Sequence, residues 1–398
     1  MKKSKEQMNR DSFSGALKIA GSSGIKRWTS ALFVLMGVFA FLSAGTLWAN
    51  NESNIPFLPS PQVVSTEPAN GDVNPYGVAF VPQGFQGTGG PLKAGDILVS
   101  NFNNSTNLQG TGNLQGTGTT IIRVAAADNS VSTFFTTPNA TLGGPGTGLS
   151  TALNILQKGF VLVGSVPSSD GSIATSGPGS LLVIDKKGKL VSSITDPMIN
   201  GPWDMTVDDR GGRAVAFVSN VFAGNVLRLE LSIGSNGVKV TNKTVIASGY
   251  QHRGDPVAFA VGPTGLVYDS EHDVLFVAST EDNAVYAVRN AEATLHDHGT
   301  GTIIYSDTTH LHGPLGMTMA PNGHLLVANS DVINSDTNQP SEIVEFTVLG
   351  KFVTQYSVDP SQGGSFGLAV QIDGDTVSFA AVDDNVPSLL IFNLPLPE

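Results

Sequence analysis

Two histidines lie in stretches whose residue types can do proton or metal chemistry. His252 stands in QHRGDP and His312 in THLHGP, and an imidazole acts as a general base or a metal ligand near neutral pH. Each stretch precedes the start of a repeated unit, and the two units are adjacent, so the two side chains can come near one another. His252 and His312 are therefore the candidate catalytic residues. The alternative is that they are ordinary loop histidines, because the chain has 7 histidines and His-x-His spacing is a weak signal.

Carboxylate and amide side chains recur at the ends of short apolar stretches. Their oxygens are the ligands that calcium prefers, six to eight of them around each ion. The candidate metal ligands are Asp282, Asn329 and Asp383. The wider set of candidate ligand-binding residues is Asn101, Asn220, Asp255, Asp282, Asn329, Asp331 and Asp383. The alternative is that Asn and Asp simply close turns with their own side chains.

Several other chemistries are excluded by composition. The chain has no cysteine, so disulfides, thiolate metal sites and cysteine nucleophiles are absent. The first 49 residues hold seven of the 21 Lys/Arg and two of the 33 Asp/Glu, which leaves a formal charge of −17 on the remainder. Such a surface repels phosphate backbones, so we expect no nucleic-acid partner.

A repeated phrase organises the chain. It consists of a small-residue turn, then Gly or Asp, then an alternating apolar stretch. The residues that align in this phrase are Gly77, Gly148, Asp204, Gly265, Gly316 and Gly367, at spacings of 71, 56, 61, 51 and 51 residues. Self-similarity near this period, with four short strands per unit, is typical of β-propeller blades.

Further strands follow each of these anchor positions. Second strands are expected at 96–102, 159–165, 214–220, 273–280, 324–330 and 375–384. Third strands are expected at 119–125, 180–186, 225–231, 283–289, 341–347 and 388–394, and fourth strands at 130–136, 189–195, 242–248, 301–307 and 351–357. All are short, rich in β-branched residues and bounded by Gly, Asn, Asp or Pro, as an antiparallel meander requires.

The sixth unit lacks a fourth strand, because the chain stops at Pro397-Glu398. Residues 61–66 (PQVVST) precede the first anchor in the same way as the fourth strand KFVTQY (351–356) precedes the last anchor. They can therefore pair with 388–394 as the missing fourth strand and close the ring. Closure removes the unpaired edges of an open sheet. The sequence therefore predicts an all-β, six-bladed β-propeller with four antiparallel strands per blade, its C-terminal blade completed by an N-terminal strand. On such a ring, the loops after second strands and the loops leading into first strands share one face, where we expect polar side chains to gather around the channel.

These phrases resemble NHL-repeat propellers, the group that includes SMP-30/gluconolactonase-like enzymes and virginiamycin B lyase-like enzymes. The strongest stretch is VGPTGLVYDSEHDVLFVASTEDNAVYAV (261–288), and the resemblance covers roughly residues 61–395. It implies the propeller fold and allows many activities. Lyase-like members imply a His base beside a metal. The lactonase-like members imply a Glu on a first strand, which the residues around Gly77, Gly265 and Gly367 do not offer.

The N-terminus reads as an export signal. Lys26 and Arg27 precede an apolar run, Ala31–Leu47, and Leu47-Trp48-Ala49 offers a cleavage site. We expect a signal peptide at 1–49, a linker at 50–60 and the NHL-type propeller at 61–398. Retention of the run as a membrane anchor stays open, because its length approaches that of a membrane span.

The residues together predict an extracytoplasmic, secreted or periplasmic monomer. We expect a binding or scaffold module whose loop face holds a small ligand, a glycan or a protein, with calcium as its one expected cofactor. The alternative is an enzyme, a metal-assisted lyase or lactone hydrolase working in the central channel with His252 and His312.

Overall fold

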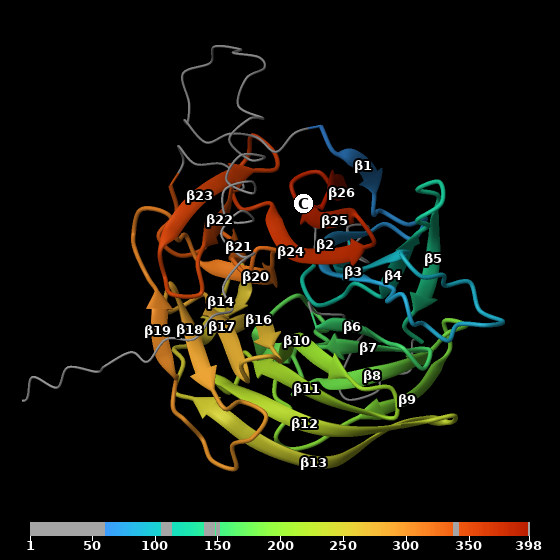
Figure 1. The fold of residues 1–398 in the computed structure, drawn as a ribbon, viewed down its shortest axis with the longest axis horizontal. Coiled ribbons are helices and arrows are strands. Elements are labelled where there is room, and N and C mark those ends of the chain that lie inside the picture. Colours follow the sequence, from blue (N-terminus) through green and yellow to red (C-terminus); the bar gives the residue numbers. More distant parts are fainter. Residues whose placement is uncertain (1–59, 105–113, 139–147, 149–151, 337–341, 397–398) are drawn as a thin grey trace, which may run out of the picture. The chain divides into compact units, whose positions relative to one another are not determined.

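The computed structural model describes residues 60–396 except 105–113, 139–147, 149–151 and 337–341. The described residues form six four-stranded antiparallel sheets that follow one another around a central axis (Figure 1). The all-β, six-bladed propeller expected from the sequence is confirmed. One short 3-10 helix, η1 (Ile173–Thr175), lies in a loop of the second blade.

Each blade is a meander whose first strand is innermost. Blade 1 comprises β2 (Asp72–Phe80), β3 (Ile97–Asn104), β4 (Thr120–Val124) and β5 (Val131–Thr136). Blade 2 comprises β6 (Leu153–Leu156), β7 (Phe160–Ser165), β8 (Ser180–Asp185) and β9 (Leu190–Ile194). Blade 3 comprises β10 (Pro202–Asp209), β11 (Arg213–Asn220), β12 (Asn225–Gly234) and β13 (Gly237–Ser248).

The second half of the ring repeats this order. Blade 4 comprises β16 (Pro263–Asp269), β17 (Val274–Ser279), β18 (Ala284–Arg289) and β19 (Thr302–Tyr305). Blade 5 comprises β20 (Pro314–Met319), β21 (Leu325–Asn329), β22 (Glu342–Phe346) and β23 (Phe352–Ser357). Blade 6 comprises β24 (Ser365–Asp373), β25 (Thr376–Asp383), β26 (Ser388–Pro395) and β1 (Gln62–Ser65).

The core lies between the blades. The second strand β7 is buried at every position, because its two faces pack against different neighbours. Val161 and Val163 join the cluster shared with blade 1, whereas Leu162 joins the cluster shared with blade 3. Burial on both faces explains why the middle strands read as continuous apolar runs rather than as alternating ones.

The anchor glycines are explained by contact between neighbouring first strands. A Cβ on Gly316 would lie 1.9 Å from the carbonyl oxygen of Phe366, and one on Gly367 would lie 2.0 Å from that of Tyr76. A Cβ on Gly265 would likewise lie 2.2 Å from the carbonyl oxygen of Leu315. The first strands of blades 4, 5, 6 and 1 therefore approach backbone to backbone, which only a residue without a side chain allows.

The last blade takes its outer strand from the other end of the domain. β1 pairs antiparallel with β26, with Val64 opposite Leu389, and the blue and red strands lie side by side in Figure 1. Val64 is 9% exposed and packs with Leu389 and Val382. The pairing is the one expected from residues 61–66.

One element was not expected from the sequence. The segment that leads into blade 4 contains a hairpin, β14 (Arg253–Asp255) with β15 (Phe259–Val261). The Oδ1 atom of Asp255 accepts hydrogen bonds from the backbone N–H groups of Val257 and Ala258, at 2.8 and 2.9 Å, which closes the turn between the two strands.

The expected signal peptide at 1–49 and linker at 50–60 fall almost wholly outside the described residues and stay predictions. Within the part of the chain that the structure describes, no helix has the length and apolar character needed to cross a membrane.

Removal of β1 tests how far the ring depends on it. The free energy of unfolding of a chain that begins at Glu67 should be lower, by on the order of 3 kcal/mol, than that of a chain that begins at Ser60. The shorter chain loses the four residue pairs between β1 and β26 and the burial of Val64. Urea unfolding of the two truncated chains measures the difference. Equal midpoints would contradict the assignment of β1 as a structural closure.

Gly316→Ala tests the close approach of the first strands. We expect it to cost about 3 kcal/mol or more in urea unfolding, because the new Cβ overlaps a backbone oxygen that cannot move independently of blade 6. Gly212→Ala is the matched control, since a Cβ there meets only the flexible Nζ of Lys158, at 3.6 Å. Similar losses in the two variants would refute the explanation.

Candidate functional site

An aromatic cluster fills the centre of the loop face. Tyr76, Phe102, Trp203, Phe259 and Phe366 come from loop-side ends of strands in blades 1, 3 and 6 and from the β14–β15 hairpin. The ring centroids of Tyr76 and Phe366 are 4.9 Å apart, and Trp203 Nε1 donates to Tyr76 Oη at 3.1 Å. We call these five residues the aromatic plug. The expected gathering of polar side chains around the channel on this face is therefore wrong, because bulky apolar residues occupy that place.

A cavity of about 540 Å³ runs along the ring axis beneath the plug. Its walls are the six first strands, and Tyr76 and Leu315 belong both to its lining and to the apolar cluster of the plug. Residues at the starts of β10, β16 and β20 are buried, whereas those at the ends are half-buried. The cavity therefore opens where the first strands end, on the side away from the plug.

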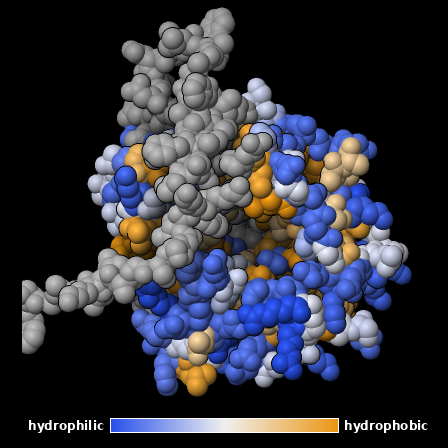
Figure 2. Space-filling model, in the orientation of Figure 1, coloured by the Kyte–Doolittle hydropathy of each residue, from blue (hydrophilic) through white to orange (hydrophobic). Residues whose placement is uncertain are grey.

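Figure 2 shows one face of the molecule, with hydrophobic residues exposed around the hollow near its middle and hydrophilic residues toward the rim. The cavity lining is likewise mixed. It includes apolar side chains such as Val207 and Met319 beside polar ones such as Thr206 and Thr318.

Asp204 occupies the anchor position of blade 3 and lines the deep part of this cavity. Its Oδ1 accepts from Met205 N at 2.7 Å and its Oδ2 from Leu266 N at 3.0 Å, so the carboxylate joins β10 to β16. Burial raises the pKa of Asp204 to about 7 despite these two hydrogen bonds. The carboxyl group thus titrates near neutral pH.

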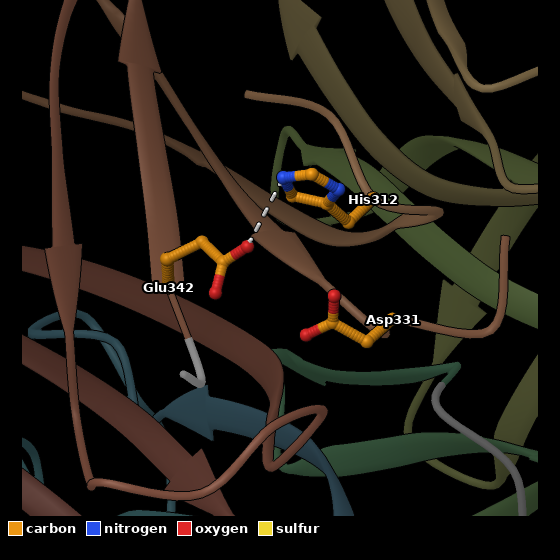
Figure 3. Close-up of side chains that lie close together, drawn as sticks. All are labelled: His312, Asp331 and Glu342. Atoms are coloured by element: carbon orange, nitrogen blue, oxygen red, sulfur yellow. Dashed lines mark ion pairs between the residues drawn. The ribbon is translucent and has the colours of Figure 1, made fainter. Parts of the chain in front are cut away.

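A second polar centre lies in the loops of blade 5, away from the cavity lining. His312 precedes β20, Asp331 follows β21, and Glu342 is the first residue of β22 (Figure 3). One ligand atom of each lies within 4.8 Å of those of the others. His312 is 1% and Glu342 0% exposed, while Asp331 is half-buried. We call these three residues the His–Asp–Glu cluster.

Two buried atoms of this cluster have no hydrogen-bond partner among the described residues, namely His312 Nε2 and Glu342 Oε2. Nε2 faces Glu342 Oε1 at 3.6 Å, which is too long for a hydrogen bond (Figure 3). The other ring nitrogen, Nδ1, lies 2.5 Å from the carbonyl oxygen of Asn334, which orients the ring so that Nε2 points toward Glu342. The pattern matches a metal ligand held by a backbone carbonyl on its far side.

Neighbouring groups position the two carboxylates. Asn329, at the end of β21, donates from Nδ2 to Glu342 Oε1 at 3.3 Å and accepts at Oδ1 from the backbone N of His312 at 2.9 Å. Asp331 Oδ2 accepts from Gly363 N at 3.2 Å, a contact that links blade 5 to the loop before β24.

The pKa values of both carboxyl groups of the cluster are raised above their ordinary values. Burial, together with the nearby Asp331 charge, raises the pKa of Glu342 to about 9. Burial also raises the pKa of Asp331, to about 6, although the imidazole of His312 acts in the opposite direction. Both shifts are typical of carboxylates that lack a compensating cation.

The donor set fits a divalent cation. One imidazole nitrogen and two carboxylate oxygens are ligands of zinc and similar transition metals, whereas calcium sites use oxygen ligands throughout. The described residues therefore contain a His/Asp/Glu group able to hold a metal ion.

The two candidate catalytic histidines do not share this centre. His312 belongs to the cluster, but His252 is exposed, outside it, and directs Nδ1 to the carbonyl oxygen of Tyr250 at 3.0 Å. The structure brings His312 instead to Asp331, which was among the expected ligand-binding residues, and to Glu342, which was not.

The remaining expected ligand-binding residues make hydrogen bonds within loops. Asn220 donates to Met198 O at 3.0 Å, and Asn101 donates to Thr66 O at the same distance. Asp282 accepts from Ser279 Oγ at 2.7 Å, and Asp383 Oδ1 accepts from Asn385 N at 3.0 Å. The contacts of Asp282 and Asp383 are the turn chemistry that was the alternative for this set, whereas Asn101 and Asn220 join segments distant in sequence. A ligand role for these residues stays a prediction.

Glu342 could have been found by comparing the blades. The first residue of the third strand is small or neutral in all the others: Thr120, Ser180, Asn225, Ala284 and Ser388. A carboxylate at this buried position breaks the pattern. The signal for Glu342 thus lay in the comparison of third strands between blades, not in the loop residues.

Comparisons with known proteins find structural neighbours only. No protein-family model matches the sequence, and no curated protein sequence matches it. Among solved structures, a catalytically inactive virginiamycin B lyase from Staphylococcus aureus with quinupristin is 14% identical, over 84% of this chain and 100% of that chain, with a TM-score of 0.47.

Two further neighbours are also propellers. Regucalcin from Agrobacterium tumefaciens, a calcium-binding protein, is 14% identical over 82% of this chain and 94% of its own, with a TM-score of 0.46. The PQQ-bound aldose sugar dehydrogenase from Streptomyces coelicolor is 14% identical over 84% and 99%, with a TM-score of 0.45. The lyase-like and SMP-30-like propeller groups named from the sequence thus occur among the structural neighbours. At 14% identity, these neighbours do not indicate which reaction or ligand this protein has.

The raised pKa of Asp204 predicts a pH dependence. The unfolded chain releases this proton near its ordinary pKa of 3.8 and the folded protein near 7, so folding binds a proton between these values and the free energy of unfolding falls as pH rises through that window. Asp204→Asn should flatten this slope. Urea unfolding at pH 4.5, 6 and 8 measures it, with Asp208→Asn on the same strand as the control. Equal slopes in Asp204→Asn and the wild type would contradict the shift.

Proposed function

We propose that this protein is an exported binding propeller that holds one divalent transition-metal ion in the His–Asp–Glu cluster of its loop face. The proposal rests on two observations: one ligand atom of each side chain lies within 4.8 Å of those of the others, and two buried atoms of the cluster, His312 Nε2 and Glu342 Oε2, have no hydrogen-bond partner among the described residues.

Burial of polar groups without hydrogen-bond partners destabilises a folded protein. A buried nitrogen or carboxylate oxygen without a hydrogen bond destabilises a fold by roughly 1–3 kcal/mol, and more when it is charged. A divalent cation would satisfy both atoms at once and would compensate the charge of Glu342 and Asp331. Two such atoms beside a third ionisable side chain, that of Asp331, are easier to explain by a ligand than by stability.

The donor chemistry also selects the kind of ion. Calcium, expected at Asp282, Asn329 and Asp383, would need a shell of oxygens, whereas the cluster contributes an imidazole. We therefore propose a zinc-like ion in place of calcium. Asn329 positions the proposed ligands, because it makes hydrogen bonds to the side chain of Glu342 and to the backbone N–H of His312.

A binding role is favoured over the alternative lyase or lactone hydrolase. Three protein ligands would leave a metal position open for water, as in catalytic zinc sites. However, none of the three residues is among those that line the axial cavity, so a metal there would not meet a substrate held in the channel. The ion would instead join β20, β21 and β22 to the loop before β24 and fix that part of the loop face.

The protein acts outside the cytoplasm as a monomer, and the loops of blades 5 and 6 that the ion fixes meet a ligand or protein there.

Metal titration tests the proposed site. The wild-type protein should bind one equivalent of Zn²⁺ in calorimetry, and excess Zn²⁺ at about 100 times Kd should add about 2.7 kcal/mol to its free energy of unfolding. Glu342→Gln should weaken binding about 100-fold, because the amide keeps the shape and removes one anionic ligand. His312→Ala should abolish binding.

The controls separate loss of a ligand from loss of the fold. His272→Ala removes an exposed histidine beside Asp269 and should leave zinc affinity unchanged. Glu342→Gln should unfold at the wild-type midpoint without metal, since Glu342 is protonated there at neutral pH. Zinc binding that survives both cluster substitutions would overturn the proposal.

A further inference from the structure

Asp204 is an acidic group at the closed end of the axial cavity with no cationic partner among the described residues. Among the described residues, its carboxylate accepts hydrogen bonds only from two backbone N–H groups. No Lys, Arg or His occurs among the described residues that line the cavity. A cavity carboxylate without a cationic partner is a recognition point for a cation.

A second carboxylate stands at the open end of the same strand. Asp209 lines the cavity and is the last residue of β10. It lies five positions along the chain from Asp204, which corresponds to about 16 Å at the rise of an extended strand. Both oxygens of Asp209 accept backbone N–H groups, from Gln157 and Gly211, which hold the carboxylate at the rim.

The wall between the two carboxylates alternates apolar and neutral polar surface. Val207, Met317 and Ala369 are among the apolar lining residues. Thr206 and Thr318 also line the cavity, and their hydroxyl groups form no hydrogen bond with the described part of the chain. Such a wall suits methylene groups interrupted by hydrogen-bond donors.

We propose that the axial cavity binds a linear aliphatic polyamine, with one terminal ammonium on Asp204 and another toward Asp209. The methylene segments lie along the apolar wall, and an inner ammonium donates to the hydroxyls of Thr206 and Thr318. This inference goes beyond the proposed metal site and does not depend on it, because the two share no residue.

The open end of the axial cavity and the net negative charge of the protein both suit a polyamine. The aromatic plug closes one end, so a ligand enters where the first strands end. The formal charge of −17 on residues 50–398 attracts a polycation to the protein, and the absence of basic lining residues disfavours anions. A volume of about 540 Å³ lies within the usual range for small-molecule sites.

Calorimetric titration with spermidine at 150 mM NaCl tests the proposal on the full chain. We expect saturable 1:1 binding to the wild type, and a loss of roughly 10- to 100-fold in Asp204→Asn, the range that one charge-assisted hydrogen bond provides. Putrescine, which is too short to span both carboxylates, should bind at least about tenfold more weakly than spermidine. 1,8-Octanediol, which has the length without the charge, should not bind.

Two matched variants complete the experiment. Asp208→Asn removes a carboxylate of the same strand that pairs with Arg210 and does not line the cavity, so spermidine affinity should stay within about twofold. Glu342→Gln should bind spermidine as the wild type does, which separates this proposal from the metal site. Multiple weak sites, or a Kd unchanged in Asp204→Asn, would overturn the proposal.

Discussion

The close approach of the first strands around the axis is the constraint on which the rest of the molecule depends. At Gly265, Gly316 and Gly367 the backbone of one blade touches the carbonyl oxygen of the next, at distances that leave no space for a side chain. The first strands of blades 4, 5, 6 and 1 meet in this way, so their sheets splay outward from the axis and bury both faces against neighbouring blades. The wide axial space that remains becomes the cavity.

The same constraint explains why polar and apolar groups lie where they do. At the loop-side end, the narrow axis is filled by the aromatic plug, and Trp203 satisfies its indole N–H through Tyr76. Polar side chains at the ends of second strands, such as Asn101 and Asn220, bond to backbone carbonyl groups of neighbouring segments. Asp204 differs from the other anchor residues, because its carboxylate takes the place of a glycine and binds the backbone of the neighbouring blade.

The two proposed sites differ in how they compensate buried charge. In the His–Asp–Glu cluster, an imidazole and two carboxylates lie close together, two of the three residues being fully buried. One small ion of high charge could be bound by all three side chains. In the axial cavity, the carboxylates of Asp204 and Asp209 lie toward opposite ends of β10, so an extended cation suits them better. Each site uses residues from loops or strand ends, as expected of function placed on a repetitive scaffold.

Local patterns were sufficient to predict much of the fold. The spacing of the anchors predicted six blades, and the apolar runs predicted the strands, because burial on both faces leaves a continuous signal. The pairing of β1 with β26 also followed from the repeat, since the last unit lacked a strand that the first segment supplied. The β14–β15 hairpin could not be predicted in this way, because its turn depends on Asp255 and its Phe259 is held by the plug.

The sequence by itself thus determined the class, the number of blades and the presence of His312, Asn329 and Asp331 in loops of one face. Only the tertiary structure decided that Glu342 joins His312, that His252 does not, and that aromatic residues occupy the axis. The physical reason is that strand patterns report which side chains are buried, whereas a site depends on which buried side chains face one another. That choice is made by loop conformations and by contacts between blades, which no single repeat encodes.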